Sequence, residues 1–301
     1  MRLLRRLPGP DNVSLERIDG NIPPYAILSH TWGSEEDEVT FLDLQNERVK
    51  EAKKILGYSK LVFCSKQAAK DELEFFWIDT CCIDKSSSVE LSEAINSMFK
   101  WYQKAQKCYV LLSDVTLYEP VQDISQEEWA KIFQNSRWFR RGWTLQEMLA
   151  PRVVEFFSRT GVRLGDKVSL LQALHQRTQV PLPALRGDAL SQFSIDDRIS
   201  WMDGRQTKRE EDVAYSLSGL LGVHMSLLYG EGREKALARL RRKAERSLQD
   251  RESPKSPALR PWTVPFSRNK DFQKRSSLDD VLKICSQPAG CATLMGSPYV
   301  G

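Results

Sequence analysis

The sequence predicts an α/β fold in which a mostly parallel sheet is flanked by helices and followed by a C-terminal helical extension. Short runs that are almost entirely apolar recur through the first half of the chain, as in strands covered on both faces. Longer amphipathic stretches separate these runs. Strands that alternate with helices favour right-handed crossovers, and therefore a largely parallel sheet with helices on both of its faces.

Four buried strands are expected in the first half of the chain. The apolar runs that predict them lie at 25–28, 75–78, 108–112 and 153–157. Helices are expected over 51–73 and 89–106, because apolar residues recur there at near-helical spacing. Ser88 is a suitable residue for the start of the second of these helices.

After Ser158 the pattern becomes mainly helical. Four helices are expected, over 166–178, 195–204, 209–221 and 231–248. The last one has an apolar face, and its opposite face is dense with basic residues: Arg233, Lys235, Arg239, Arg241, Arg242, Lys243 and Arg246. Such a face is typical of a solvated surface, and it also fits docking to an acidic partner or a membrane surface.

A domain boundary is expected after residue 250. Residues 249–260 contain two prolines and no apolar periodicity, which is typical of a linker. We therefore expect one domain over 1–250, with a core at 25–157 and a helical extension at 158–248. Residues 251–301 would then be a linker and the start of a further module, mostly disordered.

The composition is typical of a globular chain, with 41% hydrophobic and 28% charged residues among 301. No apolar run approaches the roughly 20 residues of a membrane helix, and residues 1–8 lack the continuous apolar stretch of a signal peptide. The sequence thus predicts a cytoplasmic protein without a transmembrane segment.

The charge balance and the cysteine spacing argue against two further classes of protein, those that bind nucleic acid and those that hold a metal ion. Residues 1–250 hold 36 basic and 36 acidic residues, so the large domain lacks the basic excess that nucleic-acid binding needs. The six cysteines form no Cys-x-x-Cys pair and no cluster with histidine, so no metal site is expected and the thiols are expected to be reduced.

Candidate functional residues follow the predicted strands, because ligands of parallel α/β sheets bind outside the carboxyl ends of the strands. The first strand leads into Ser29, His30 and Trp32, and the second into Asp79 and Asp84. The third is followed by Ser113 and Asp114, and then by a segment with Arg137, Arg140 and Glu147.

Each candidate also has a structural interpretation. A histidine at a strand end is often a hydrogen-bonded structural residue, and Asp79 and Asp84 suit loop or helix caps. Glu147 lies four residues after Trp143 on a short predicted helix, so it shares the side of that tryptophan. A salt bridge to Arg137 or Arg140 would account for a carboxylate there.

Four segments, in order, resemble the heterokaryon incompatibility (HET) domain of filamentous fungi. They are YAILSHTWG at 25–33, WIDTCCIDK at 77–85, ELSEAINSM at 90–98 and RGWTLQEMLAP at 141–151. Stretches at 208–216 and 228–236 resemble the region that often follows the HET core, so the similarity covers about 20–247. The resemblance implies a cell-death effector of non-self recognition and fungal innate immunity, commonly fused to a nucleotide-binding receptor module.

HET domains are in turn remotely similar to TIR domains, which implies a TIR/flavodoxin-like core. In enzymatic TIR domains a glutamate on the helix after the third strand is the catalytic residue of NAD hydrolysis, and the order of elements places Glu147 there. His30 or Asp79 would orient water or the ribose. The other implied contacts to NAD as substrate are Ser29, Trp32, Asp84, Arg137 and Arg140. The reaction needs no cofactor and no metal.

The last residues, Gly296 to Gly301, have the Gly-x-x-x-x-Gly spacing of the first part of a P-loop. Residues 261–272 resemble the segment that leads into NTPase modules of fungal receptor proteins. These features predict an amino-terminal fragment of a HET/NTPase receptor-type protein.

The sequence is therefore compatible with three functions. The first is a cell-death effector that hydrolyses NAD. The second is a non-enzymatic module that self-associates and recruits partners. The third is a cysteine hydrolase that uses Cys81 or Cys82 with His30.

Overall fold

The structure is a computed structural model, and it describes residues 1–9, 12–34, 36–46, 55–117 and 126–252. Residues 1–253 form one compact unit. The module expected at 251–301, with its P-loop-like glycines, lies outside the described residues. Only residues 251 and 252, which end the last helix, are described. No helix in the described part of the chain is long and apolar enough to cross a membrane.

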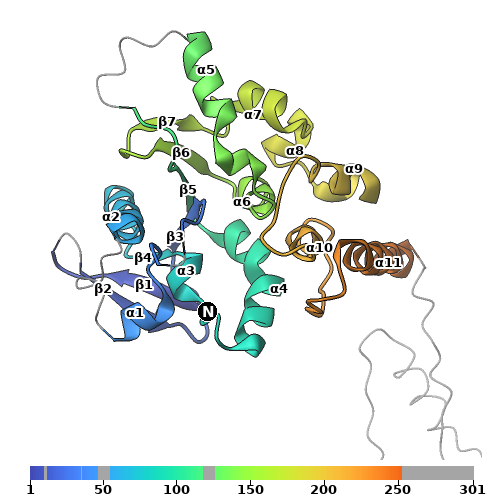
Figure 1. The fold of residues 1–301 in the computed structure, drawn as a ribbon, viewed down its shortest axis with the longest axis horizontal. Coiled ribbons are helices and arrows are strands. Elements are labelled where there is room, and N and C mark those ends of the chain that lie inside the picture. The colour runs from blue at the N-terminus through green and yellow to red at the C-terminus, as the bar shows by residue number, and fades with distance from the viewer. Residues whose placement is uncertain (10–11, 35, 47–54, 118–125, 253–301) are drawn as a thin grey trace, which may run out of the picture. The chain divides into compact units, whose positions relative to one another are not determined.

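A seven-stranded sheet forms the centre of the fold (Figure 1). Its strands are β1 (Arg2–Arg6), β2 (Val13–Arg17), β3 (Tyr25–His30), β4 (Phe75–Trp77), β5 (Lys107–Leu112), β6 (Val154–Ser158) and β7 (Arg163–Asp166). They are ordered β2-β1-β4-β3-β5-β6-β7. The four central strands run parallel, while β1, β2 and β7 pair antiparallel at the two sides. The α/β prediction with a mostly parallel centre is confirmed.

The four parallel strands have the flavodoxin-like order 2-1-3-4, since β3 lies between β4 and β5. The crossover from β3 to β4 therefore runs in one direction along the sheet, and the crossover from β4 to β5 runs back past β3 in the other. The strand order reverses between β3 and β5, and ligands of such sheets bind at the carboxyl ends of the strands at this point.

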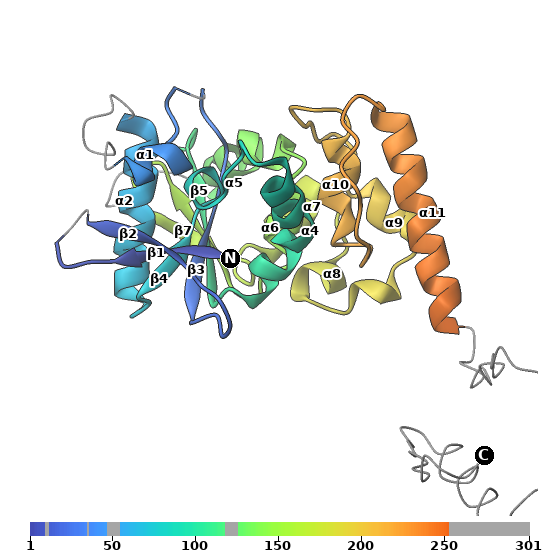
Figure 2. The ribbon, with the colours of Figure 1, turned by 90° about the horizontal axis from the view of Figure 1, so that it is seen from below.

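Helices cover both faces of the sheet (Figure 2). In the first half they are α1 (Phe41–Gln45), α2 (Ile55–Lys70), α3 (Asp79–Cys82), α4 (Ser88–Lys104), α5 (Gln126–Asn135), the 3₁₀ helix η2 (Arg137–Arg140) and α6 (Thr144–Leu149). α2 packs on β3, β4 and β5, whereas α6 contacts β3 and α4 across the sheet from α2. Every residue of β3 is buried, as the apolar run predicted for a strand covered on both faces.

The helical extension follows β7. It comprises α7 (Leu171–Thr178), α8 (Leu182–Arg186), the 3₁₀ helix η3 (Leu190–Gln192), α9 (Ile195–Ser200), α10 (Asp212–Ser218) and α11 (Arg233–Glu252). α10 packs against α4, α6 and α11 and so joins the extension to the sheet domain. The helical extension is confirmed, but the helix expected over 166–178 begins at Leu171, because residues 163–166 form β7.

Candidate functional site

The candidate residues gather at the carboxyl ends of β3 and β5, where the strand order reverses. The loops that follow the two strands are joined by a hydrogen bond of 2.9 Å between the hydroxyls of Thr31 and Ser113. α6 brings Glu147 to β3, and α3 brings Asp79 to the same edge from the end of β4.

Glu147 is the central group of the cluster and is only 7% exposed. The hydroxyl of Ser29 donates to its Oε2 at 2.5 Å, and the indole Nε1 of Trp138 donates to the same hydroxyl at 2.8 Å. The hydroxyl of Tyr102 adds a contact to the carboxyl group and donates to the carbonyl of Leu28 at 3.0 Å. The sheet and two helices thus fix the Glu147 side chain in one position.

Burial raises the pKa of Glu147 to about 8, and the negative charge of Asp79 acts in the same direction. The hydrogen bond from Ser29, the charge of Arg141 and the contact with Tyr102 oppose this rise only in part. An isolated buried carboxylate is costly, so the side chain keeps its proton at neutral pH. Glu147 is therefore mainly a neutral acid in the folded protein.

The salt bridge of Glu147 to Arg137 or Arg140, which the sequence left open as the structural interpretation, is not formed. Arg137 is exposed; its backbone N–H donates to Asp114 at 2.7 Å, and its guanidinium lies 3.6 Å from the same carboxylate. Arg140 is also exposed. η2 turns both side chains outward, and the positive charges that act on Glu147 are those of Arg141 and the buried Arg205.

His30 and Asp79 form the second part of the site. The Nε2 atom of His30 lies 3.8 Å from Oε2 of Glu38 and 3.9 Å from Oδ1 of Asp79. His30 Nε2 and Asp79 Oδ1 are both buried, and neither has a hydrogen-bond partner among the described residues. Unpartnered buried polar atoms are uncommon, and two that face each other at a strand end indicate a place for a water molecule or a ligand group.

Trp32 covers this part of the site. Its Nε1 donates to Oδ2 of Asp79 at 2.7 Å, and the ammonium group of Lys85 lies 3.6 Å from the centre of its ring. Asp79 keeps 18% of its side chain exposed. The Trp32 ring thus contacts Asp79 at its edge and Lys85 on its face.

Sequence reasoning missed the ion pair between Glu38 and Lys60, which are 5% and 2% exposed. Burial raises the pKa of Glu38, but His30, Lys60 and the Gly33 N–H, which donates at 2.7 Å, lower it to about 2. Lys60 also donates to the carbonyl of Thr31 at 3.0 Å. The pair fixes the loop after β3, and no periodicity in the sequence indicates it.

Asp84 does not join the cluster. Its Oδ1 accepts hydrogen bonds from the backbone N–H of Ser86 at 3.0 Å and from the Ser86 hydroxyl at 2.6 Å. This arrangement closes the loop before α4, which is the capping interpretation that the sequence left open.

The cysteines next to Asp79 do not suit nucleophilic chemistry. Cys81 and Cys82 are buried, and the pKa of Cys81 is raised well above its ordinary value by its contact with Cys82 and by burial. The thiolate, which is the reactive form, is therefore disfavoured. Within the described residues no group of three histidine, cysteine or acidic side chains could hold a metal ion.

The arrangement suits acid and base chemistry. The negative charge of Asp79 acts on the neutral carboxyl of Glu147, and His30 lies 3.9 Å from Asp79 and 3.8 Å from Glu38, the carboxylate with a low pKa. Carboxyl groups whose pKa values are pushed apart within one cluster are typical of sites that combine an acid with a charged stabilising group.

Comparison with known proteins agrees with the sequence motifs. Residues 25–121 match the family described as "Heterokaryon incompatibility protein (HET)". "Vegetative incompatibility protein HET-E-1" of Podospora anserina is 55% identical over 244 residues, which is 81% of this chain. The chain spans 18% of the length of that relative. No solved structure matches the chain.

Proposed function

Because the chain contains a heterokaryon incompatibility domain, we propose that it is a cell-death effector of fungal non-self recognition that acts by TIR-like hydrolysis of NAD. The observation that supports the reaction is the buried carboxyl group of Glu147, held by Ser29 at the point where the strand order reverses. The site needs no cofactor, since NAD is the substrate.

In the proposed reaction the bond between nicotinamide and the ribose C1′ breaks. Its electron pair goes to the pyridinium nitrogen, so nicotinamide leaves as a neutral molecule and the ribose becomes an oxocarbenium ion. Water then adds to C1′ and loses a proton. A carboxylate beside the ribose stabilises the positive charge that develops in the transition state.

Glu147 would become that carboxylate when the substrate binds. A nearby positive charge favours the ionised form of an acid, so the cationic nicotinamide ring would lower the pKa of Glu147 from about 8. The proton would leave to solvent, and the carboxylate would lie next to the ribose. His30 and Asp79, with their facing unpartnered atoms, would hold the attacking water.

Access to Glu147 would run past Trp32 and Lys85. Since Glu147 and His30 are 7% and 6% exposed, NAD reaches them only if the Trp32 ring leaves Asp79. The freed ring could then stack on nicotinamide or adenine. We assign no phosphate contact to Arg137 or Arg140, whose side chains are turned outward, nor a ribose contact to Asp84.

The test is the release of nicotinamide from NAD by the purified, assembled protein. Glu147→Gln keeps the size and the neutral state of the side chain but cannot ionise, so turnover should fall by two orders of magnitude or more, as on removal of a main electrostatic stabiliser. Glu155→Gln is the matched control, because Glu155 is a half-buried carboxylate of β6 that pairs with Lys107 and Arg163, away from Glu147. A stable Glu147→Gln variant with full turnover and full toxicity would exclude the carboxyl mechanism.

The alternative function is a non-enzymatic module that self-associates. The exposed basic face of α11, with Arg233, Lys235, Arg242 and Arg246, supports the recruitment of an acidic partner by such a module, because this face is turned to solvent while the opposite face packs on α10. In this case the domain would act in cis with a receptor-type NTPase module in the cytoplasm. Light scattering that shows assembly, together with killing that persists without NAD loss, would favour this function.

A further inference from the structure

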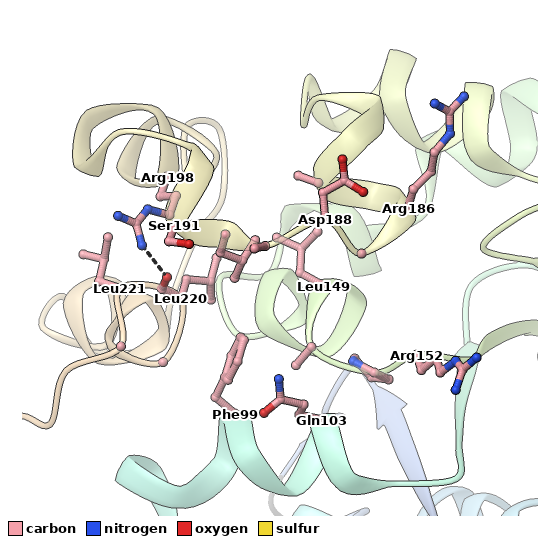
Figure 3. A pocket seen from close by; sticks show the side chains of 18 of the residues that line it. Phe99, Gln103, Leu149, Arg152, Arg186, Asp188, Ser191, Arg198, Leu220 and Leu221 are labelled. Atoms are coloured by element: carbon pink, nitrogen blue, oxygen red, sulfur yellow. Dashed lines mark hydrogen bonds between the residues drawn. The ribbon is translucent and has the colours of Figure 1, made fainter.

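A cavity of about 550 Å³ lies between α4, α6 and the helical extension. Phe99 and Gln103 of α4, Leu149 of α6 and Leu220 after α10 line it (Figure 3). None of the candidate residues of the Glu147 site lines it. Its volume is within the range of small-molecule sites in proteins.

The charged lining is mainly basic. Four cationic side chains line the cavity, namely Arg152, Lys167, Arg186 and Arg198. The only carboxylate in the described lining is that of Asp188, which is exposed. Arg152 and Arg186 lie on the same side of the view in Figure 3, opposite Arg198. An excess of positive charge around a concave surface attracts anions.

Lys167 is the buried member of this group and is 6% exposed. Its ammonium group donates to the carbonyls of Pro151 at 2.7 Å and Met148 at 3.4 Å, which uses two of its three hydrogens. No carboxylate of the described residues forms an ion pair with it. Burial lowers its pKa to about 8. A buried charge is ordinarily paired, so an anion in the cavity would supply the partner that the chain itself does not provide.

We propose that this cavity binds a small organic phosphate. Its phosphate group lies at Lys167, with Arg152 and Arg186 at the rim, and its apolar or aromatic part packs on Phe99 and Leu149. A phosphate carries up to two negative charges and offers several acceptor oxygens to lysine and arginine, which matches the excess of cations better than a single carboxylate does. The apolar wall accounts for the rest of the volume.

Calorimetric titration of the full chain with adenosine monophosphate, adenosine and inorganic phosphate tests the proposal. Adenosine monophosphate should bind about tenfold more tightly than either of its halves, because only it fills both parts of the cavity. Equal affinity for adenosine would refute recognition of the anion, and equal affinity for inorganic phosphate would refute the role of the apolar wall. Absence of binding at millimolar concentration would overturn the proposal.

Two variants locate the phosphate. Lys167→Met should weaken binding of adenosine monophosphate about tenfold or more. Asp188→Asn removes an exposed carboxylate without touching the core, and it should strengthen binding about two- to fivefold by removing repulsion. Asp203→Asn is the control, because Asp203 is exposed and lies outside the cavity.

If Lys167→Met does not fold, the Asp188→Asn result decides alone. An unchanged affinity in Asp188→Asn would place the phosphate elsewhere and overturn the proposal. These measurements need no catalysis, so their outcome is separate from that of the NAD assay.

Discussion

Glu147 should make the stability of the folded protein fall as the pH rises. Its folded pKa of about 8 lies above the ordinary 4.5, so the folded chain holds a proton that the unfolded chain has released. The stabilisation is therefore fully present below about pH 4.5 and is lost as the pH rises through about 8. Glu147→Gln cannot titrate, so it should not show this loss.

The magnitude follows from the two pKa values. Between pH 6 and pH 9 the free energy of unfolding of the wild type should fall by about 2.5 kcal/mol relative to Glu147→Gln. Urea unfolding of both proteins at the two pH values measures this difference. All other titrating groups are shared by the two proteins and cancel to first order. Any change in hydrogen bonding caused by glutamine adds the same offset at both pH values.

Glu155→Gln is again the control, and its free energy of unfolding should run parallel to that of the wild type between pH 6 and pH 9. If the wild type and Glu147→Gln also run parallel, the carboxyl group is ionised throughout this range. The argument that burial keeps Glu147 neutral would then be refuted.

Three further predictions concern other parts of the chain. Lys60→Met leaves the buried Glu38 without its cation and should lower the free energy of unfolding by about 3–5 kcal/mol in urea, whereas adding Glu38→Gln should restore part of the loss. The double change of Cys81 and Cys82 to Ser should leave nicotinamide release at least partly intact if it folds; complete loss in a folded variant would revive the cysteine hydrolase. Limited proteolysis should cut first beyond Leu248, and early cuts within residues 25–157 would contradict the domain assignment.

The sequence predicted the four parallel strands because strands buried on both faces are continuous apolar runs. β1 was missed although Leu3 and Leu4 are fully buried, because three arginines surround these leucines in a five-residue strand. Arg2 and Arg5 find their carboxylate partners, Glu90 and Glu74, in distant segments. A strand whose charges are paired only by tertiary contacts has no apolar pattern of its own.

Two features of the sequence were enough to predict several residues of the site, namely the ends of the predicted strands and the order of the family motifs. The rule on strand ends led to Ser29, His30 and Asp79, and the family resemblance led to Glu147. The contacts that decide their chemistry were not predictable. Tyr102 reaches Glu147 from the far end of α4, and Lys60 reaches the loop after β3 from α2, so both depend on how helices pack on the sheet.

The neutral state of Glu147 accounts for how a carboxyl group can lie in the core, and under the proposed function it would also let that group serve a cationic substrate. A permanently ionised Glu147 would need a paired cation, and among the described residues the charges of Arg141 and Arg205 act on it without forming an ion pair. A protonated Glu147 carries no charge and so needs no such partner, and its Oε2 still accepts the hydrogen bond from the Ser29 hydroxyl. Its charge would then appear only when a positively charged ring takes the place of the missing cation. The same burial that makes the carboxyl group tolerable in the empty site would thus confine its negative charge to the complex in which the oxocarbenium ion forms.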